Sequence, residues 1–401
     1  MNYSTAESWL FSRRRLGMKY NLERMQALMD ALGRPQEAFR TVHVVGTNGK
    51  GSTTAVLAAL GRGLGLRVGH TTSPHLLNYR ERINLDDAWI PEEEAARFVT
   101  DHRALIQKYS ATFFEITTAM AAWFFAGNGA EWVIAEAGLG GRLDATRVFR
   151  GEATVFTGVQ IEHSRILGST RALIAAEKVA VAEAGTLLVT ASQTPDVESV
   201  VTGTVDRLGL RRVQPFPVDC APLPGPHQKH NGGLALAAAS EVFGHPFDQV
   251  RAVYDELCTN GLKWPGRLDV RAGSPTILFD VAHNPESMEA LLGFVKDWGK
   301  PVPSVIGFLS DKPWQTMVEM VAGTVSPVFA VTPLSERMLP ADELAEAFRS
   351  AGVECTPFET IEEALAACRR FTGNGKMIVT GSFFVVGEAM LQAERHGWVR
   401  P

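Results

Sequence analysis

The 401-residue sequence has few cysteines, no long hydrophobic run and no excess of positive charge. Its four cysteines are widely spaced without a C-x-x-C pair, which argues against a zinc ribbon or a disulfide scaffold. The most apolar segment, residues 116–126, is about half as long as the roughly 20 residues that a membrane span needs. No apolar run of signal-peptide length precedes the first charges. The net charge of −5 excludes a generally basic nucleic-acid-binding protein. We therefore expect a cytoplasmic protein without a membrane or nucleic-acid partner.

Compact runs rich in Val, Ile and Thr alternate with helical patterns along the whole chain. This alternation predicts α/β architecture, in which a parallel sheet carries helices on both faces. A Pro-Gly pair at 265–266 interrupts the pattern and marks the predicted boundary between domains at 1–266 and 267–401. In the first domain, the predicted strands are 41–46, 67–73, 131–138, 154–160 and 185–192, and the predicted helices are 51–65, 91–108, 113–127 and 168–183. In the second, the predicted strands are 275–282, 303–310, 327–333 and 376–386, and the predicted helices are 285–298, 313–322, 341–351 and 361–370.

The stretch VVGTNGKGST, residues 44–53, lies between a predicted strand and a predicted helix, as a phosphate-binding loop does. It departs from the pattern G-x-x-x-x-G-K-[ST], because Gly51 and not a hydroxyl residue follows Lys50. Three glycines allow close approach of a phosphate, the helix N-terminus offers N–H groups, and Lys50 adds a positive charge. An ordinary tight turn is the alternative interpretation.

Polar residues follow several other predicted strands, where ligands bind in open α/β sheets. Glu136 precedes the run GLGGR, and Glu162 and His163 follow the next strand. Oxygen ligands suit Mg²⁺, and an imidazole is a less usual ligand. Taken singly, a carboxylate here is more often a cap or an ion-pair partner, and His163 is more often structural. Lys178, in an alanine-rich helix, has a solvated helix face as its alternative.

The second domain has a comparable cluster at LFDVAHNPESM. Asp280 is placed to accept hydrogen bonds from a ribose, and His283 to reach a phosphate. Asn284 before Pro285 is also a typical helix N-cap, and both interpretations can hold together.

Eight motifs, in order over nearly the whole chain, resemble one family. They are HVVGTNGKGS, TTSPHL, FFEITTAMA, EAGLGGRLDAT, LGST with IAAEK, HQKHN, PGR and DVAHNP. They are similar to the folylpolyglutamate synthase and dihydrofolate synthase family of Mur-type ATP-dependent amide ligases. The resemblance implies an N-terminal P-loop-type domain with the acyl-substrate site, and a smaller Rossmann-like domain that closes over the nucleotide and binds glutamate. It also implies that ATP phosphorylates a carboxylate and that the amino group of L-glutamate attacks the acyl phosphate.

The resemblance also implies roles for single residues. Lys50, Lys178 and His163 would be catalytic, with carbamylation of Lys178 and two Mg²⁺ ions as further expectations, and the protein would be a monomer. The acyl substrate would be dihydropteroate or a reduced folate. ATP would contact Asn48, Gly49, Lys50, Gly51, Ser52, Asn231, Arg267, Asp280 and His283; the metal would contact Ser73, Glu136 and His163; the acyl substrate would contact Thr112, Phe114, Asp144 and Ala145.

Several positions depart from the family pattern. Gln160 and Glu162 stand in QIEH where the family usually has GLDH, and Arg147 stands in DATR where it usually has DATN. These changes flank the expected metal and acceptor region, so a Mur-type ligase for another carboxylate is the alternative substrate hypothesis. A nucleotide-binding protein without ligase activity is the alternative from another functional class.

Overall fold

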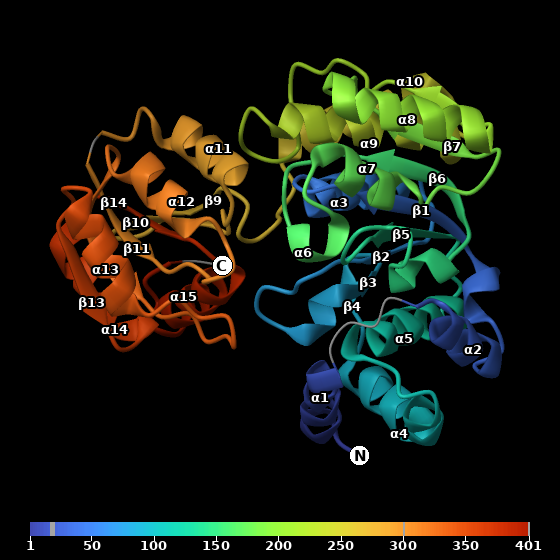
Figure 1. Cartoon of the computed structure of the whole chain (residues 1–401), viewed down its shortest axis with the longest axis horizontal. Helices are drawn as coiled ribbons and strands as arrows, with labels where there is room; N and C mark the ends of the chain where they lie inside the picture. Colours follow the sequence, from blue (N-terminus) through green and yellow to red (C-terminus); the bar gives the residue numbers. More distant parts are fainter. Residues whose placement is uncertain (17–20, 300, 400–401) are drawn as a thin grey trace. The chain divides into compact units, whose positions relative to one another are not determined.

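The computed structural model describes residues 1–16, 21–299 and 301–399, and the chain forms two compact units (Figure 1). Unit 1 contains Met1–Pro222 and Gln228–Leu262, and unit 2 contains Leu223–His227 and Lys263–Pro401. Unit 1 therefore ends four residues before the predicted boundary at 266. The short excursion Leu223–His227 into unit 2 was not predicted.

Unit 1 is built on an eight-stranded sheet with the order β4-β3-β2-β5-β1-β6-β7-β8. Its strands are β1 (Arg40–Val45), β2 (Val68–Thr71), β3 (Ile83–Leu85), β4 (Ala88–Trp89), β5 (Trp132–Glu136), β6 (Gly151–Phe156), β7 (Leu187–Thr190) and β8 (Arg211–Val213). Its helices are α1 (Tyr3–Ser12), α2 (Glu23–Ala31), α3 (Lys50–Gly63), α4 (Glu92–Lys108), α5 (Phe113–Gly127), α6 (Ser164–Leu167), α7 (Arg171–Val179), α8 (Pro195–Leu208), α9 (Gln228–Val242) and α10 (Phe247–Asn260), with short 3₁₀ helices η1 (Arg13–Leu16), η2 (Pro35–Ala38), η3 (Tyr79–Arg82) and η4 (Ala145–Val148).

The central strands of unit 1 are covered on both faces, as the apolar runs predicted. Every residue of β5 is buried, although side chains alternate between the faces of a sheet. Val133 and Ala135 pack with α5 in one hydrophobic cluster. Figure 1 shows α9 and α5 on opposite sides of this sheet. A strand buried on both faces is typical of parallel sheets between helix layers.

The sheet of unit 1 is not wholly parallel, which corrects the prediction. β3 pairs antiparallel with β2 and with β4. The turn between β3 and β4 has two residues, Asp86 and Asp87, with φ angles of 52° and 65°. Positive φ at both central positions is the conformation that two-residue hairpins favour, and aspartate tolerates it better than most residues. The two strands are too short to give a recognisable alternation of apolar and polar residues, so the sequence did not predict this hairpin.

Unit 2 has a six-stranded sheet with the order β13-β12-β11-β14-β10-β9, in which β9 is antiparallel to β10. Its core cluster joins α11, α12 and α13 to the sheet, while α14 and α15 also contact central strands. Its strands are β9 (Asp269–Arg271), β10 (Thr276–Asp280), β11 (Val302–Ile306), β12 (Val325–Val331), β13 (Cys355–Phe358) and β14 (Lys376–Thr380), and its helices are α11 (Pro285–Val295), α12 (Trp314–Val321), α13 (Ala341–Ser350), α14 (Ile361–Thr372) and α15 (Phe383–Arg395).

The predicted strand 376–386 is wrong beyond Thr380. Gly381 has a φ of 110°, which ends the strand, and Ser382 then caps α15 by accepting a hydrogen bond from Val385 N at 3.2 Å. Phe383 therefore begins a helix. A serine two residues after a strand is a typical N-cap, and the apolar run FFVV concealed it in the sequence.

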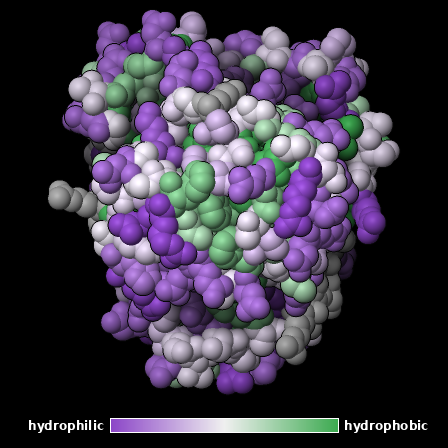
Figure 2. Space-filling model, turned by 90° about the vertical axis from the view of Figure 1, so that its left-hand side faces the viewer, coloured by the Kyte–Doolittle hydropathy of each residue, from purple (hydrophilic) through white to green (hydrophobic). Residues whose placement is uncertain are grey.

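The chain has no disulfide among its described residues. All four cysteines, Cys220, Cys258, Cys355 and Cys368, are free thiols. Within residues 1–16, 21–299 and 301–399, no helix is long and apolar enough to cross a membrane. Figure 2 shows one mostly hydrophilic face with a patch of hydrophobic residues near its middle.

Candidate active site

The loop between β1 and α3 has the geometry of a phosphate-binding turn. Gly49 has a φ of 84° and is the N-cap of α3, which begins at Lys50. The first N–H groups of a helix have no intrahelical acceptor and carry the positive end of its dipole. A Cβ at Gly49 would lie 2.4 Å from Asn231 Oδ1, and one at Gly46 would lie 1.9 Å from Thr157 Oγ1. Both positions therefore require glycine.

Two lysines converge on one carbonyl of this loop. Lys50 Nζ donates to Gly46 O at 3.0 Å and to Thr47 O at 2.9 Å. Lys178 Nζ, from α7, donates to the same Gly46 O at 2.6 Å and to Glu162 Oε1 at 2.9 Å. The side chain of Lys178 is only 3% exposed, so the alternative of a solvated helix face is wrong.

The three charged groups set the electrostatics beneath the loop. Burial and the charge of Lys50 lower the pKa of Lys178 to about 8. Burial alone would raise the pKa of Glu162, but Lys178 and Lys50 outweigh it and lower this pKa to about 2. At pH 7 one carboxylate thus faces two ammonium groups. The two ammonium groups, together with the N–H groups at the start of α3, favour an anionic ligand beside the loop.

Helix α9 supports the loop from the side. Ser52 Oγ accepts from Gln228 Nε2 at 3.2 Å, and Gln228 Oε1 accepts from Asn231 Nδ2 at 2.9 Å. All three side chains are buried. The structure thus brings the predicted residues Ser52 and Asn231 together with the loop. Gln228 was not predicted, although the HQKHN motif contains it.

The predicted metal residues lie in unit 1, on the chain at or after the ends of β2, β5 and β6. Glu136 is the last residue of β5, is buried, and accepts from Ser73 N at 3.3 Å through Oε2. His163 is partly exposed and has a left-handed backbone with a φ of 47° at the start of α6. Among the described residues, no three His, Cys, Asp or Glu side chains form a metal-binding group. The metal assignment therefore stays a prediction.

The predicted acyl-substrate residues have structural partners as well. Thr112 and Glu115 form the capping box of α5, and the Thr112 hydroxyl donates to Glu115 Oε2 at 2.8 Å. Asp144 caps η4, where its carboxylate accepts from Thr146 and from Leu139 N. Burial raises the pKa of Asp144. The helix caps explain the conformations of Thr112 and Asp144 without a ligand, so their substrate roles stay predictions.

The other two predicted acyl-substrate residues lie close to the GLGG loop. Ala145 is buried at the start of η4. A Cβ at Gly138 would lie 2.6 Å from Cζ of Phe114, so the Phe114 ring packs directly on the backbone that follows Glu136. This contact brings the predicted aromatic surface close to the predicted metal carboxylate.

A cluster of rings and guanidinium groups beside α5 was not predicted. Phe11 stacks on Phe113 with ring centroids 5.6 Å apart. The Arg14 guanidinium lies over both rings, at 4.3 and 4.8 Å, and that of Arg82 lies 5.2 Å from Phe113. No sequence spacing links these residues, because tertiary packing brings them together from α1, η1, η3 and α5.

In unit 2, three side chains gather at the end of β10. The ring of Phe383 lies 5.0 Å from the Arg267 guanidinium and 5.8 Å from the ring of His283. Asp280 accepts from Leu268 N and Ala282 N, and burial raises its pKa to about 6. Asn284 caps α11 by accepting from Ser287 N, which confirms the capping interpretation. Phe383 was missed because its segment was assigned to a strand.

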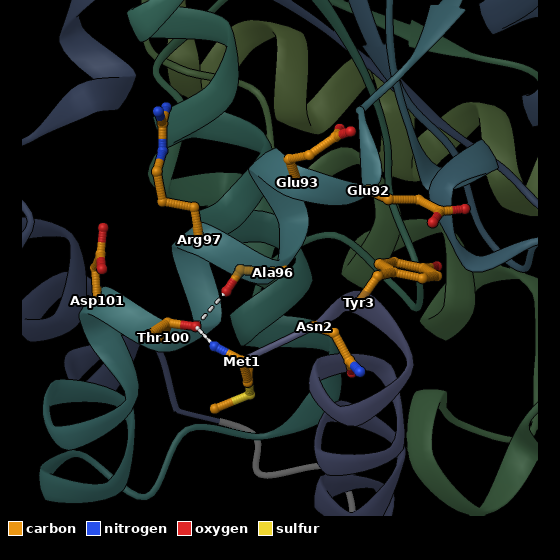
Figure 3. A pocket seen from close by; sticks show the side chains of 9 residues that line it. All are labelled: Met1, Asn2, Tyr3, Glu92, Glu93, Ala96, Arg97, Thr100 and Asp101. Atoms are coloured by element: carbon orange, nitrogen blue, oxygen red, sulfur yellow. Dashed lines mark hydrogen bonds between the residues drawn. The ribbon is translucent and has the colours of Figure 1, made fainter.

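A cavity of about 490 Å³ in unit 1 contains none of the predicted residues (Figure 3). It lies at the first residues of the chain and α4, where the Met1 amino group donates to Thr100 Oγ1 at 3.0 Å. It is therefore separate from the loop that we consider the candidate active site.

Comparison with known proteins agrees with this geometry. The family model described as Mur ligase, glutamate ligase domain matches residues 266–383. The folylpolyglutamate synthase of Lacticaseibacillus casei is 30% identical over 96% of this chain and 97% of its own length. The Mycobacterium tuberculosis folylpolyglutamate synthase complexed with ADP has a TM-score of 0.89 and 28% identity, covering 100% of this chain and 98% of that one. The bifunctional folylpolyglutamate synthase/dihydrofolate synthase of Yersinia pestis, complexed with AMPPNP and a Mn ion, has a TM-score of 0.85 and 27% identity, covering 98% of each chain. The chain therefore belongs to the folylpolyglutamate synthase/dihydrofolate synthase family.

Proposed function

We propose that this protein is an ATP-dependent ligase that joins L-glutamate to the carboxylate of dihydropteroate, of a reduced folate, or of both. The observation that carries this proposal is the convergence of Lys50, Lys178 and Glu162 beneath a glycine loop, in a chain of this family. These groups supply what phosphoryl transfer needs, namely a rigid phosphate cradle and fixed positive charge.

The reaction has two steps. A carboxylate oxygen of the acyl substrate attacks the γ-phosphorus of ATP, the bond to the bridging oxygen breaks, and ADP leaves. The uncharged amino group of glutamate then attacks the acyl carbon of the mixed anhydride, loses a proton, and expels phosphate to leave an amide. A carboxylate is a poor acceptor for an amine, so activation as the anhydride is required.

The loop residues act by binding and orientation. The first N–H groups of α3 and the Lys50 ammonium would hold the ATP phosphates. To do so, Lys50 must exchange the carbonyls of Gly46 and Thr47 for phosphate oxygens. Lys178, held by Gly46 O and Glu162, would keep the loop in place during this exchange. In unit 2, Arg267, His283 and Asp280 would contribute further nucleotide contacts.

The residues around Glu136 fit a divalent cation. A buried carboxylate beside Ser73 offers the hard oxygen donors that Mg²⁺ prefers, and Mg²⁺ usually completes its shell with water and substrate phosphates. We propose Ser73, Glu136 and His163 as the residues that hold it. When bound, the ion would neutralise charge on the transferring phosphoryl group. A second ion and carbamylation of Lys178 are finer proposals, supported only by the resemblance.

Mass spectrometry of the products tests the function. Purified protein is incubated with MgATP, L-glutamate and, in turn, dihydropteroate, tetrahydrofolate and a panel of other carboxylic acids. We expect ADP and a product heavier by one glutamyl residue with at least one of the first two acids. A product formed only from another acid would support the alternative ligase. Binding of ATP without any product would support the nucleotide-binding protein.

Site variants test the assignment of the loop and of the metal carboxylate. Lys50→Ala and Glu136→Ala should each abolish glutamate-dependent ADP formation while the protein stays folded. Unchanged turnover in either variant would refute the role assigned to that residue, whichever acid is the substrate.

A further inference from the structure

Arg82 is a buried cation without a carboxylate partner in the described part of the chain. The residue is 6% exposed, at the end of η3. Its Nε donates to His75 Nδ1 at 2.7 Å, which is a neutral acceptor when Arg82 is the donor. Its two terminal nitrogens donate to no residue that the structure describes, and they are not sealed from solvent. Burial lowers the pKa of Arg82 to about 10, so the group is still charged at pH 7.

The carboxylates near Arg82 have other partners. Glu81 is adjacent in sequence, but its oxygens accept from the N–H groups of Leu76, Leu77 and Asn78. Glu136 interacts with Arg82 only through its longer-range charge, and it accepts from Ser73 N. A buried charge without a partner is costly, and a bound anion would remove that cost.

The surroundings of Arg82 suit an aromatic acid. One face of its guanidinium lies 5.2 Å from the ring of Phe113, which stacks on Phe11. Arg14 lies over the same two rings and adds a second positive charge. An apolar, ring-lined surface beside cations favours a flat molecule that carries a negative group.

The backbone connects Arg82 to the candidate metal site. Arg82 O accepts from Thr72 N at 3.3 Å, and the next residue, Ser73, donates its N–H to Glu136. Phe113 precedes Phe114, whose ring packs on Gly138, two residues after Glu136. Arg82 thus lies near both the aromatic cluster and the carboxylate that we assign to the metal.

We propose that the terminal nitrogens of Arg82 bind the carboxylate of the aromatic acyl substrate and orient it for phosphorylation. This inference rests on the proposed function and extends it by naming the residue that recognises the reacting group. The two terminal nitrogens match a carboxylate in planar, bidentate geometry, which a lysine does not reproduce. After phosphoryl transfer, the same cation would face the oxygens of the acyl phosphate.

Two variants and a matched control test Arg82. Arg82→Gln removes the positive charge. Arg82→Lys keeps the charge but lacks the planar pair of terminal nitrogens. Arg80→Lys is the control: this arginine is two residues away, pairs with Glu92 at 3.4 Å and lies 5.7 Å from the ring of Trp89. The first readout is the Kd for the acyl acid that the wild type converts, measured by calorimetry without ATP. The methyl ester of the same acid is measured in parallel.

We expect both Arg82 variants to bind the acid at least tenfold more weakly and to bind the ester as the wild type does. KM for the acid should rise by a similar factor, while the Kd for ADP and the melting temperature stay near wild type. The Arg80 control should change none of these values. A purely structural role would instead weaken acid and ester equally and lower the melting temperature.

The outcomes separate this inference from the proposed function. If the wild type converts neither dihydropteroate nor a reduced folate, the proposed function fails before any variant is compared. If the wild type is active and Arg82→Gln binds the acid as tightly as wild type, the inference about Arg82 is wrong. Equal losses for acid and ester would also overturn it, since binding would then not depend on the carboxylate.

Discussion

Glu162 Oε1 lies 2.9 Å from Lys178 Nζ, which is buried and donates to Gly46 O of the phosphate loop. The family resemblance implies an aspartate at the position of Glu162. In this chain the glutamate carboxylate partners the lysine. Because Lys178 also donates to Gly46 O, removing either partner of this pair should alter the position of the loop.

Glu162→Gln should destabilise the protein and impair the loop. Removing one partner of a buried ion pair typically costs about 3–5 kcal/mol, because the other charge is left uncompensated. We discount this to about 2–3 kcal/mol, since Glu162 keeps 16% of its side chain exposed. Scanning calorimetry should show a lower melting temperature, and titration should show a higher Kd for ATP. Glu177→Gln is the control, because Glu177 pairs with Arg142 at a more exposed position on α7, the helix that carries Lys178. Equal effects in both variants would contradict the importance of the pair.

Carbamylation of Lys178 is tested separately with ¹³C-bicarbonate. A carbamate on Lys178 would give a carbonyl resonance that disappears in Lys178→Arg and persists in Lys108→Arg, an exposed lysine of α4. Depletion of carbon dioxide should then lower the rate of ADP formation. Absence of the resonance with full activity would mean that Lys178 works as an unmodified ammonium group.

Gly49→Ala should weaken ATP binding at least tenfold. The new Cβ would lie 2.4 Å from Asn231 Oδ1, so the loop or α9 must move. Gly65→Ala is a matched control, since Gly65 has nearly the same φ, 83° against 84°, and a Cβ there meets nothing within 4 Å. Both variants carry the strain of a positive φ, and only Gly49→Ala adds the clash. Similar nucleotide affinities for the two variants, measured by titration with ADP, would show that the close approach at Gly49 is unimportant.

Acid should destabilise unit 1 through two buried histidines. Burial lowers the pKa of His43 to about 4 and that of His70 to about 3, whereas an unfolded histidine has a pKa of about 6.5. Below pH 6.5 the unfolded chain takes up protons that the folded chain does not. The free energy of unfolding therefore decreases as the pH is lowered. At pH 5 the loss is about 2 kcal/mol for each histidine.

Urea unfolding at pH 7 and pH 5 checks this prediction. His43→Gln keeps a donor for Phe149 O, which the His43 ring contacts at 2.7 Å. It should remove about a third of the histidine contribution to the pH dependence, because burial also lowers the pKa of His75 to about 3. His245→Gln, on a loop before α10, should leave it unchanged. A wild-type midpoint that does not change between the two pH values would contradict the neutral, buried state of both rings.

Much of the architecture was predictable because local rules determine it. Buried strands such as β5 gave compact apolar runs, and the glycine loop identified the start of α3. Residues at strand ends, such as Glu136 and Asp280, could be predicted as candidates for the same reason. The β3–β4 hairpin was missed because two aspartates, and not an Asn-Gly pair, occupy its turn. The helix that begins at Phe383 was not predicted, because the apolar run after Ser382 is also typical of a strand.

Contacts made by tertiary packing could not be predicted in this way. The role proposed for Arg82 depends on its surroundings, because neither its burial nor the lack of a carboxylate partner among the described residues appears in any local pattern. The same holds for Gln228, which contacts Ser52 from a helix 176 residues further along the chain. Lys178 shows the reverse error: an alanine-rich helix suggested exposure, and packing against Gly46 produced burial.

Glu136→Gln should separate metal binding from nucleotide binding. The substitution keeps the size and an oxygen acceptor for Ser73 N but removes the negative charge that a divalent cation requires. Titration of Mn²⁺ into the protein with ADP, followed by electron paramagnetic resonance, should show an affinity at least tenfold below wild type. The Kd for ADP measured without metal should not change. Glu131→Gln, one residue before β5, is the control, because the Glu131 carboxylate contacts Arg67 N at 2.7 Å. If Glu136→Gln binds Mn²⁺ as the wild type does, another group holds the metal, and the assignment of Ser73 that depends on its neighbour Glu136 is wrong as well.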